Sequence, residues 1–193
     1  MTLLVKVEGI ESGKSVDKQF ASCTANGRGA TEPGGNRSPI ISWIGAPADT
    51  ESFVVMVVDR DVPADFSLAN VPGHVIAEDA ARKSFYHWLM VDIPPAITRL
   101  DDRTAAYGQK GRNSFGDRAR GQNGYDGPCP PFNDARIHTY HFMVFALGIN
   151  SLGLANGFSG EQVEAAIKGH ILAQGGVSAT YTTNPDLILR TVA

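Results

Sequence analysis

The sequence predicts a mainly β fold, a sandwich of two antiparallel sheets with a few short helices. Glycine and proline together make up about one residue in six, above the usual ~12%, which indicates many turns rather than long helices. Short segments rich in β-branched and aromatic residues recur between Gly, Pro and Asp residues. Three of them are apolar on both faces, as expected for central strands that are covered on either side.

The chain of 193 residues has the size of one domain, and no linker or repeat divides it, so we predict a single domain over residues 1–193. A net charge of −3 with 19% charged residues does not favour nucleic-acid binding. No apolar run approaches the ~18 residues of a membrane-spanning helix. The N-terminus carries Lys6 and Glu8 and lacks the pattern of a secretory signal, so we expect a cytoplasmic protein.

Strands are predicted wherever the short apolar segments occur. The first covers residues 2–8. The glycine-containing segment after it resembles a phosphate-binding loop, but its glycine spacing is one residue short, so we predict a hairpin turn there. The further strands cover residues 38–44, 53–58, 85–93 and 138–147, and the last three of these are apolar on both faces.

One stretch has a clear helical period. Apolar side chains recur at helical spacing over about residues 160–173. Ser159, with Gln162 three residues later, matches a capping box at the start of this helix. We expect Gly175 and the glycine after it to end the helix, and the alternating residues 177–182 to form another strand.

The least regular stretch covers residues 94–128. A loop of this length in a compact domain is usually functional or mobile. Its local excess of positive charge could collect an anion, although solvated surface decoration is the competing explanation. Its charged residues include Arg99, Arg103, Lys110, Arg112, Arg118 and Arg120 against Asp101, Asp102 and Asp117.

Two aspartates directly follow a predicted strand. Side chains alternate along an extended chain, so Asp59 and Asp61 are expected on one side and Arg60 on the other. Neighbouring carboxylates repel each other and favour a cation or a hydrogen-bond donor between them. The competing explanation is that the pair only caps a turn at Val62 and Pro63.

The spacing of His138 and His141 would suit a metal site on a helix, but this segment is predicted to be a strand. His138 then shares a face with Tyr140, and His141 points the other way. The common signatures of serine hydrolases and zinc sites are missing from the sequence. We therefore predict no metal ligand, no cofactor and no catalytic residue.

Residues 124–131, Gly-Tyr-Asp-Gly-Pro-Cys-Pro-Pro, form a rigid segment because three prolines fix φ and lack a backbone N–H. Free backbone donors are therefore few in this run. Cys129 offers one of them, and a free N–H of this kind can bind an anion.

Taken in order, these motifs resemble the phosphatidylethanolamine-binding protein family, also called the Raf kinase inhibitor protein family, and in particular its bacterial and archaeal branch. Residues 59–63, Asp-Arg-Asp-Val-Pro, resemble the family's Asp-Pro-Asp-x-Pro motif, and His87 lies where the family has a strand histidine. Residues 127–131 and 138–140 resemble its Gly-x-x-Pro-Pro and His-Arg-Tyr motifs. The resemblance covers about residues 20–182.

This resemblance implies the same sandwich fold, with a pocket at one end that binds phosphate or a phospholipid head group. Imidazole and phenol groups can donate to phosphate oxygens there. If His87 or His138 is charged, anion binding should weaken above about pH 7. Carried over motif by motif, the expected ligand-binding residues are Asp59, Asp61, His87, Pro131, His138 and Tyr140, with the backbone N–H of Cys129 as a donor.

The function that follows is a non-enzymatic binding module for a small anionic ligand such as phosphate or phosphorylethanolamine. Its expected cellular role is to regulate a partner protein such as a protease or a kinase-like enzyme. Peripheral lipid contact and a homodimer are further expectations. The alternative is a small hydrolase or lyase that uses the aspartate, histidine and tyrosine side chains as general acid and base. A purely structural or oligomer-forming protein is a third alternative, which fits the long basic loop but leaves the polar pocket unexplained.

Two cysteines, Cys23 and Cys129, are too few for a disulfide scaffold or a four-cysteine zinc site. The resemblance implies that the two lie close together, so a single long-range disulfide is one alternative. Because the expected location is the cytoplasm, where thiols are kept reduced, we predict two free thiols.

Overall fold

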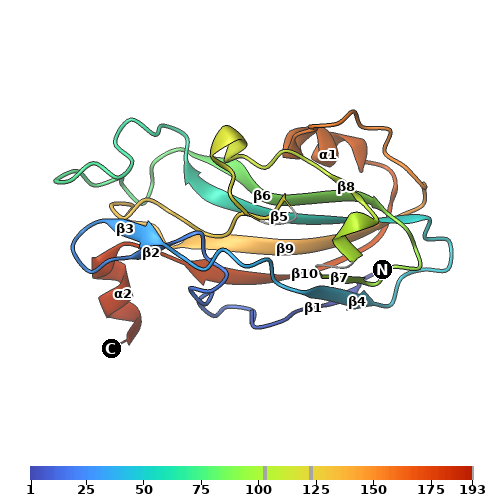
Figure 1. Cartoon of the computed structure of the whole chain (residues 1–193), viewed down its shortest axis with the longest axis horizontal. Helices are drawn as coiled ribbons and strands as arrows, with labels where there is room; N and C mark the ends of the chain where they lie inside the picture. The colour runs from blue at the N-terminus through green and yellow to red at the C-terminus, as the bar shows by residue number, and fades with distance from the viewer. Residues whose placement is uncertain (102–103, 122–123, 193) are drawn as a thin grey trace.

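The computed structural model describes residues 1–101, 104–121 and 124–192. Five strands form one sheet in the order β10-β9-β5-β6-β8, three form a second in the order β1-β4-β7, and β2 and β3 form a small ribbon (Figure 1). All of these pairings are antiparallel. The predicted mainly β sandwich is therefore confirmed.

The elements have the following bounds: β1 Leu4–Val7, β2 Cys23–Ala25, β3 Thr31–Pro33, β4 Ile41–Ile44, β5 Ser52–Pro63, β6 Arg82–Ile93, β7 Arg99–Leu100, β8 Gln109–Lys110, β9 His138–Leu147, α1 Gly160–Ala166, β10 Ile171–Tyr181 and α2 Pro185–Val192. Two short 3₁₀ helices, η1 Thr104–Ala106 and η2 Gly116–Arg118, lie between β7 and β9. Neither α1 nor α2 has the length and apolar character needed to cross a membrane, nor does any other described helix.

The central strand β5 is buried on both faces. Its odd-numbered residues from Phe53 to Val57 pack in the core shared with β1 and β4, and its even-numbered residues from Val54 to Val58 pack in a second core with α1. Figure 1 shows the same layers, with β1 and β4 on one side of the large sheet and α1 on the other. The prediction of central strands covered on both sides is confirmed.

The strand predicted for residues 138–147 is β9 to the residue. The strands predicted for residues 53–58 and 85–93 both extend further, to Pro63 in β5 and from Arg82 in β6. The turn considered at Val62 is not formed, because Val62 and Pro63 still pair with β6. Pairing with a neighbouring strand thus continues β5 through the aspartate motif.

The helix predicted for residues 160–173 is twice as long as the observed helix, α1, which has 7 residues. The capping box of Ser159 and Gln162 is present, but α1 ends at Ala166 and Gly169 has a left-handed φ of 83°. Residues 171–181 instead form β10, which pairs along the whole of β9. Gly175 does not stop a helix: it lies inside β10, where a Cβ would collide with the carbonyl of Leu3. Long-range strand pairing therefore overrides the helical period.

The irregular stretch of residues 94–128 contains β7, η1, β8 and η2, which the sequence did not predict. Two of the charged residues that the sequence analysis named in this stretch, Asp102 and Arg103, lie outside the described residues. Near the N-terminus, Val7 and Ile10 form an antiparallel bridge across a turn at Gly9, in place of a phosphate-binding loop.

Cys23 and Cys129 form a disulfide, so the prediction of two free thiols is wrong. The bond joins the start of β2 to the proline-rich segment, and the backbone supports it, since the N–H groups of Ser22 and Cys23 donate to the carbonyl of Pro128. The spatial closeness comes from tertiary structure across a separation of 106 residues, which the sequence alone did not fix.

We expect this disulfide to contribute about 4–5 kcal/mol to the free energy of unfolding, the value that the chain-entropy model gives for a loop of this length. Thiol titration in denaturant without reductant should find no free thiol groups. Urea unfolding in the presence of dithiothreitol should show an unfolding free energy that is lower by this amount. A Cys23→Ser, Cys129→Ser variant serves as the control, because its stability should not respond to the reductant. Two titratable thiols in the oxidised preparation would contradict the bond.

Candidate functional site

A cavity of about 540 Å³ lies at one end of the large sheet, where β5 ends and where β6 and β9 begin. Its volume is typical of ligand pockets, which are mostly formed by concave, largely apolar walls with a few polar groups. Six of the seven predicted binding residues line it: Asp59, His87, Cys129, Pro131, His138 and Tyr140. Their role in binding a ligand stays a prediction, but their convergence on one cavity is a property of the fold.

A β-bulge turns His87 toward the cavity. Val57 pairs with Trp88, but the next residue of β5 pairs with Tyr86, so His87 is an extra residue in β6. In a regular strand, His87 and Trp88 would face opposite sides, whereas a bulge re-aims one side chain. The His87 ring consequently stands 5.1 Å from the ring of Tyr140, centroid to centroid.

A second bulge turns Asp61 away from the cavity. Between Asp59 and Val62, β5 has one residue more than β6, so the simple alternation that predicted Asp59 and Asp61 on one side does not hold. Asp59 and Val62 line the cavity, and Asp61 does not. Asp61 instead accepts hydrogen bonds from the N–H of Thr139 at 2.9 Å and from the guanidinium of Arg136 at 3.2 Å.

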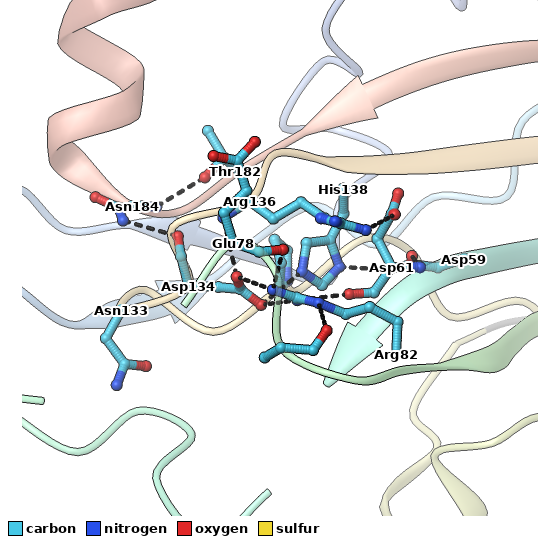
Figure 2. Close-up of polar contacts among 12 residues, drawn as sticks. Asp59, Asp61, Glu78, Arg82, Asn133, Asp134, Arg136, His138, Thr182 and Asn184 are labelled. Carbon is cyan, nitrogen blue, oxygen red and sulfur yellow. Dashed lines mark hydrogen bonds and ion pairs between the residues drawn. The ribbon is translucent and has the colours of Figure 1, made fainter. Parts of the chain in front are cut away.

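His138 lies between two carboxylates (Figure 2). Its Nδ1 donates to Asp59 at 2.6 Å and its Nε2 donates to Asp134 at 3.1 Å. Burial opposes the charged form, but these two hydrogen bonds outweigh it and raise the pKa of His138 to about 9. His138 is therefore charged at neutral pH. Both of its N–H groups are already used, so it does not offer the free positive donor that the sequence suggested.

Arg82 completes this buried chain of charges. Its guanidinium binds both carboxylate oxygens of Asp134, at 2.6 and 3.1 Å, and its other N–H groups donate to the backbone carbonyls of residues 61, 77, 78 and 80. Burial alone would raise the pKa of Asp134, yet hydrogen bonds from His138 and Arg82 keep it below its ordinary value. The amide of Asn184 donates to the Asp134 carbonyl, which anchors the segment before α2 beside the same cluster (Figure 2).

His87 is held by the backbone of Asp126. Its Nδ1 lies 2.7 Å from the Asp126 carbonyl oxygen, which can only accept, so the proton is on Nδ1. Burial lowers the pKa of His87, and this effect is larger than the opposing effect of the negative charge on Asp59. The ring is therefore neutral at pH 7. Its Nε2 is buried and has no hydrogen-bond partner within the described chain.

Tyr140 presents a second unused polar atom. The side chain is fully buried, and its hydroxyl makes no well-formed hydrogen bond with any described group although it lies near the Asp59 carboxylate. Burial and that carboxylate raise the pKa of Tyr140 well above 10. Tyr140 therefore stays protonated and can donate.

The proline-rich segment supplies one further donor. Pro128, Pro130 and Pro131 have no N–H, and the N–H of Gly127 donates to the Asn36 side chain. The N–H of Cys129 donates to no described group, and Cys129 lines the cavity. The disulfide fixes the position of this residue.

Sequence reasoning missed much of the cavity wall. Asp126 is buried and accepts from the side-chain amides of Asn36 and Asn113, at 2.9 and 2.8 Å, so it fixes the loop that holds His87. Its place inside the Gly-Tyr-Asp-Gly-Pro run was the available signal. The aromatic wall, which comprises Phe66, Phe85 and Phe115, has no motif. Arg118 and Arg120, named from the sequence among the charges that could collect an anion, lie exposed at the rim.

The described residues 1–101, 104–121 and 124–192 contain no group of three or more His, Cys, Asp or Glu side chains arranged to hold a metal ion. The carboxylates at the cavity are already committed to His138, Arg82 and side-chain amides. The unsatisfied atoms at the cavity, by contrast, are one acceptor and two donors, which suit a hydrogen-bonding ligand.

The sequence model of the family described as phosphatidylethanolamine-binding protein matches residues 8–182. The chain belongs to this family. The resemblance drawn from the aspartate, proline and histidine motifs is thus confirmed, and so is the expected bacterial and archaeal branch.

Relatives are spread across bacteria and archaea. A UPF0098 protein of Aquifex aeolicus is 31% identical over 184 residues, which cover 93% of this chain and 96% of that protein. The UPF0098 protein YbcL of Escherichia coli K12 is 31% identical over 156 residues, which cover 77% of this chain and 73% of the relative.

Two solved structures share the fold. The crystal structure of E. coli YbcL, described as a new member of the mammalian PEBP family, has a TM-score of 0.71 at 26% identity and covers 94% of this chain and 99% of its own. That of a putative PEBP homologue from Chlamydia trachomatis has a TM-score of 0.68 at 24% identity, covering 93% of this chain and 97% of its own.

The buried charge chain predicts how stability depends on pH. The pKa of His138 is about 9 in the folded protein and about 6.5 when unfolded, so its contribution is complete below pH 6.5 and is lost as the pH rises through 9. The unfolding free energy should fall by roughly 3 kcal/mol over that range. Urea titrations at several pH values would measure it.

The matched control is His138→Gln, whose amide cannot titrate. Its unfolding free energy should be lower at pH 6.5 and nearly constant up to pH 9. A wild-type protein whose stability is flat or rises over the same interval would rule out a charged, doubly hydrogen-bonded His138.

Proposed function

We propose that this protein is a non-enzymatic binding module whose cavity takes a small anion, either phosphate or a phosphorylated head group. The observation that carries the proposal is the set of unsatisfied polar atoms that line the cavity. His87 Nε2 and the Tyr140 hydroxyl are buried and have no partner in the described structure, although a buried polar atom without a hydrogen bond costs about 1–3 kcal/mol. The N–H of Cys129, a half-buried residue, also donates to no described group.

Charge at the cavity mouth supports an anion. Arg118 and Arg120 are exposed, line the cavity and form no ion pair with a described residue. The carboxylate of Asp59 deeper in the cavity is compensated by the charged His138. An approaching anion therefore meets positive charge at the rim and hydrogen-bonding groups below it.

A hydrolase or lyase remains the alternative, because a neutral His87 with a free Nε2 is what a general base requires. Activation of a side-chain nucleophile needs a hydrogen bond between that nucleophile and the base. No described hydroxyl or thiol makes such a bond to His87. Binding without turnover fits this arrangement better, and p-nitrophenyl phosphate should be returned unhydrolysed.

In the cell, we expect the bound state to regulate a partner protein, and we place the protein in an oxidising compartment. Disulfides persist in such compartments and are rare in the cytoplasm. The disulfide between Cys23 and Cys129 therefore argues against the cytoplasmic location expected from the N-terminal sequence.

Substitution of the two residues with unused atoms tests the site. His87→Ala and Tyr140→Phe should each weaken the binding of inorganic phosphate by about 1–3 kcal/mol, because each removes a hydrogen-bonding group from a buried site. Isothermal titration calorimetry measures the affinity. His141→Ala is the control, since His141 is on the opposite face of β9 and contacts Ser178. Unchanged affinity in both site variants would refute the assignment.

A further inference from the structure

The unused atoms at the cavity differ in hydrogen-bonding role. Because His87 Nδ1 carries the proton and donates to the Asp126 carbonyl, Nε2 has only a lone pair to offer. The Tyr140 hydroxyl and the Cys129 N–H offer hydrogen atoms. The site thus presents one acceptor beside two donors, and a ligand that fits it must supply one hydrogen atom of its own.

The surroundings of His87 keep it in this form. Asp59 of β5 and Asp126 of the adjoining loop are the carboxylates that face it, and Tyr140 of β9 stacks edge-on against it. Arg118 and Arg120 stand at the rim. Burial of the ring disfavours the charged form more than the two carboxylates favour it, which lowers the pKa of His87. The ring therefore meets a ligand as an acceptor.

A fully deprotonated oxyanion would set one of its oxygens against the lone pair of Nε2. Two acceptors facing each other in a buried site leave both unsatisfied, at a cost comparable to a lost hydrogen bond for each. An oxyanion that keeps one proton avoids this cost, because its P–OH donates to Nε2 while its other oxygens accept from the two donors.

We propose that the cavity selects the monoanion of a phosphomonoester, with its P–OH donating to His87 Nε2 and its unprotonated oxygens accepting from the Tyr140 hydroxyl and the Cys129 N–H. This inference rests on the proposed anion-binding function and adds the protonation state of the ligand, with the consequence that diesters are excluded. A phosphodiester, such as an intact phospholipid head group, has no P–OH and leaves His87 Nε2 without a partner.

The walls of the cavity suit an ester better than inorganic phosphate. A volume of about 540 Å³ is several times larger than a phosphate group needs, and Phe66, Phe85 and Phe115 line the remaining space. Phe85 and Phe115 meet edge to face at 5.0 Å and both contact the His87 ring. An organic substituent on the phosphate can pack against these rings.

Phenyl phosphate and phenyl sulfate provide a matched pair of probes. At pH 5.5 both are mainly monoanions of nearly the same shape, but only phenyl phosphate carries an acidic proton, since its second ionisation lies near pH ~6. Calorimetric titration should show at least tenfold tighter binding of phenyl phosphate. Above its second ionisation its affinity should fall about tenfold per pH unit, while that of phenyl sulfate stays weak and nearly constant.

Equal affinities at pH 5.5, or an affinity for phenyl phosphate that rises with pH, would overturn the inference and leave anion binding itself intact. Failure of both probes and of inorganic phosphate to bind at any pH would instead overturn the proposed function. Methyl phenyl phosphate, a diester without the proton, should bind as weakly as phenyl sulfate.

Two further measurements locate the effect at His87. In His87→Gln the amide can rotate to offer a donor, so the ratio of the affinities for phenyl phosphate and phenyl sulfate should fall to about one. In His141→Gln this ratio should stay as in the wild-type protein. If the His87→Gln variant does not fold, ¹⁵N-histidine NMR of the wild-type complex still decides. A neutral His87 protonated on Nδ1 supports the inference, and an imidazolium in the phenyl phosphate complex overturns it.

Discussion

The cavity depends on the buried ionic chain that runs from Arg82 through Asp134 and His138 to Asp59. Four charges in a low-dielectric interior are tolerated only when each is paired and hydrogen-bonded, and here each one is. The chain joins β5, β6 and β9 to the loop that precedes β9, so it fixes the three strands whose ends form the cavity. Replacement of any one member would leave a buried charge without its partner, which costs far more than the pair gains.

The two β-bulges give this end of the sheet its function. One adds a residue to β6 and brings His87 to the side of Tyr140, and the other adds a residue to β5 and turns Asp61 out to Arg136. A regular ladder would place His87 on the opposite face and both aspartates on the same one. At this end of the sheet, the site therefore requires exceptions to the alternation on which core packing depends.

Sequence patterns predicted the features that depend on interactions between residues close together in the sequence. The short run of β-branched and aromatic residues predicted the bounds of β9 correctly, and Ser159 with Gln162 marked the start of α1, since both signals depend on neighbours in sequence. The end of α1, the position of Asp61 and the disulfide to Cys129 depend instead on pairing with distant strands. Motif resemblance found Asp59, His87, Cys129, His138 and Tyr140 at the cavity. The aromatic wall was missed because it has no motif, and the role of Asp126 was missed because its amide partners are distant in sequence.

The described structure satisfies almost all of its buried side-chain polar atoms, and two of the three exceptions meet at this cavity, His87 Nε2 and the Tyr140 hydroxyl. The same fold gives Asp134 two hydrogen bonds from Arg82 and gives Asp126 two side-chain amide donors, so buried polar atoms nearby are well satisfied. Each unpaired atom lowers the stability of the free protein and is compensated when a partner binds. The surrounding constraints, a disulfide and three prolines on one side and a charged His138 on the other, hold these atoms in place before that partner arrives. The free-energy cost of unsatisfied polar atoms therefore lies mainly at the cavity, where a bound ligand would remove it. This is the expected arrangement for a preorganised binding site.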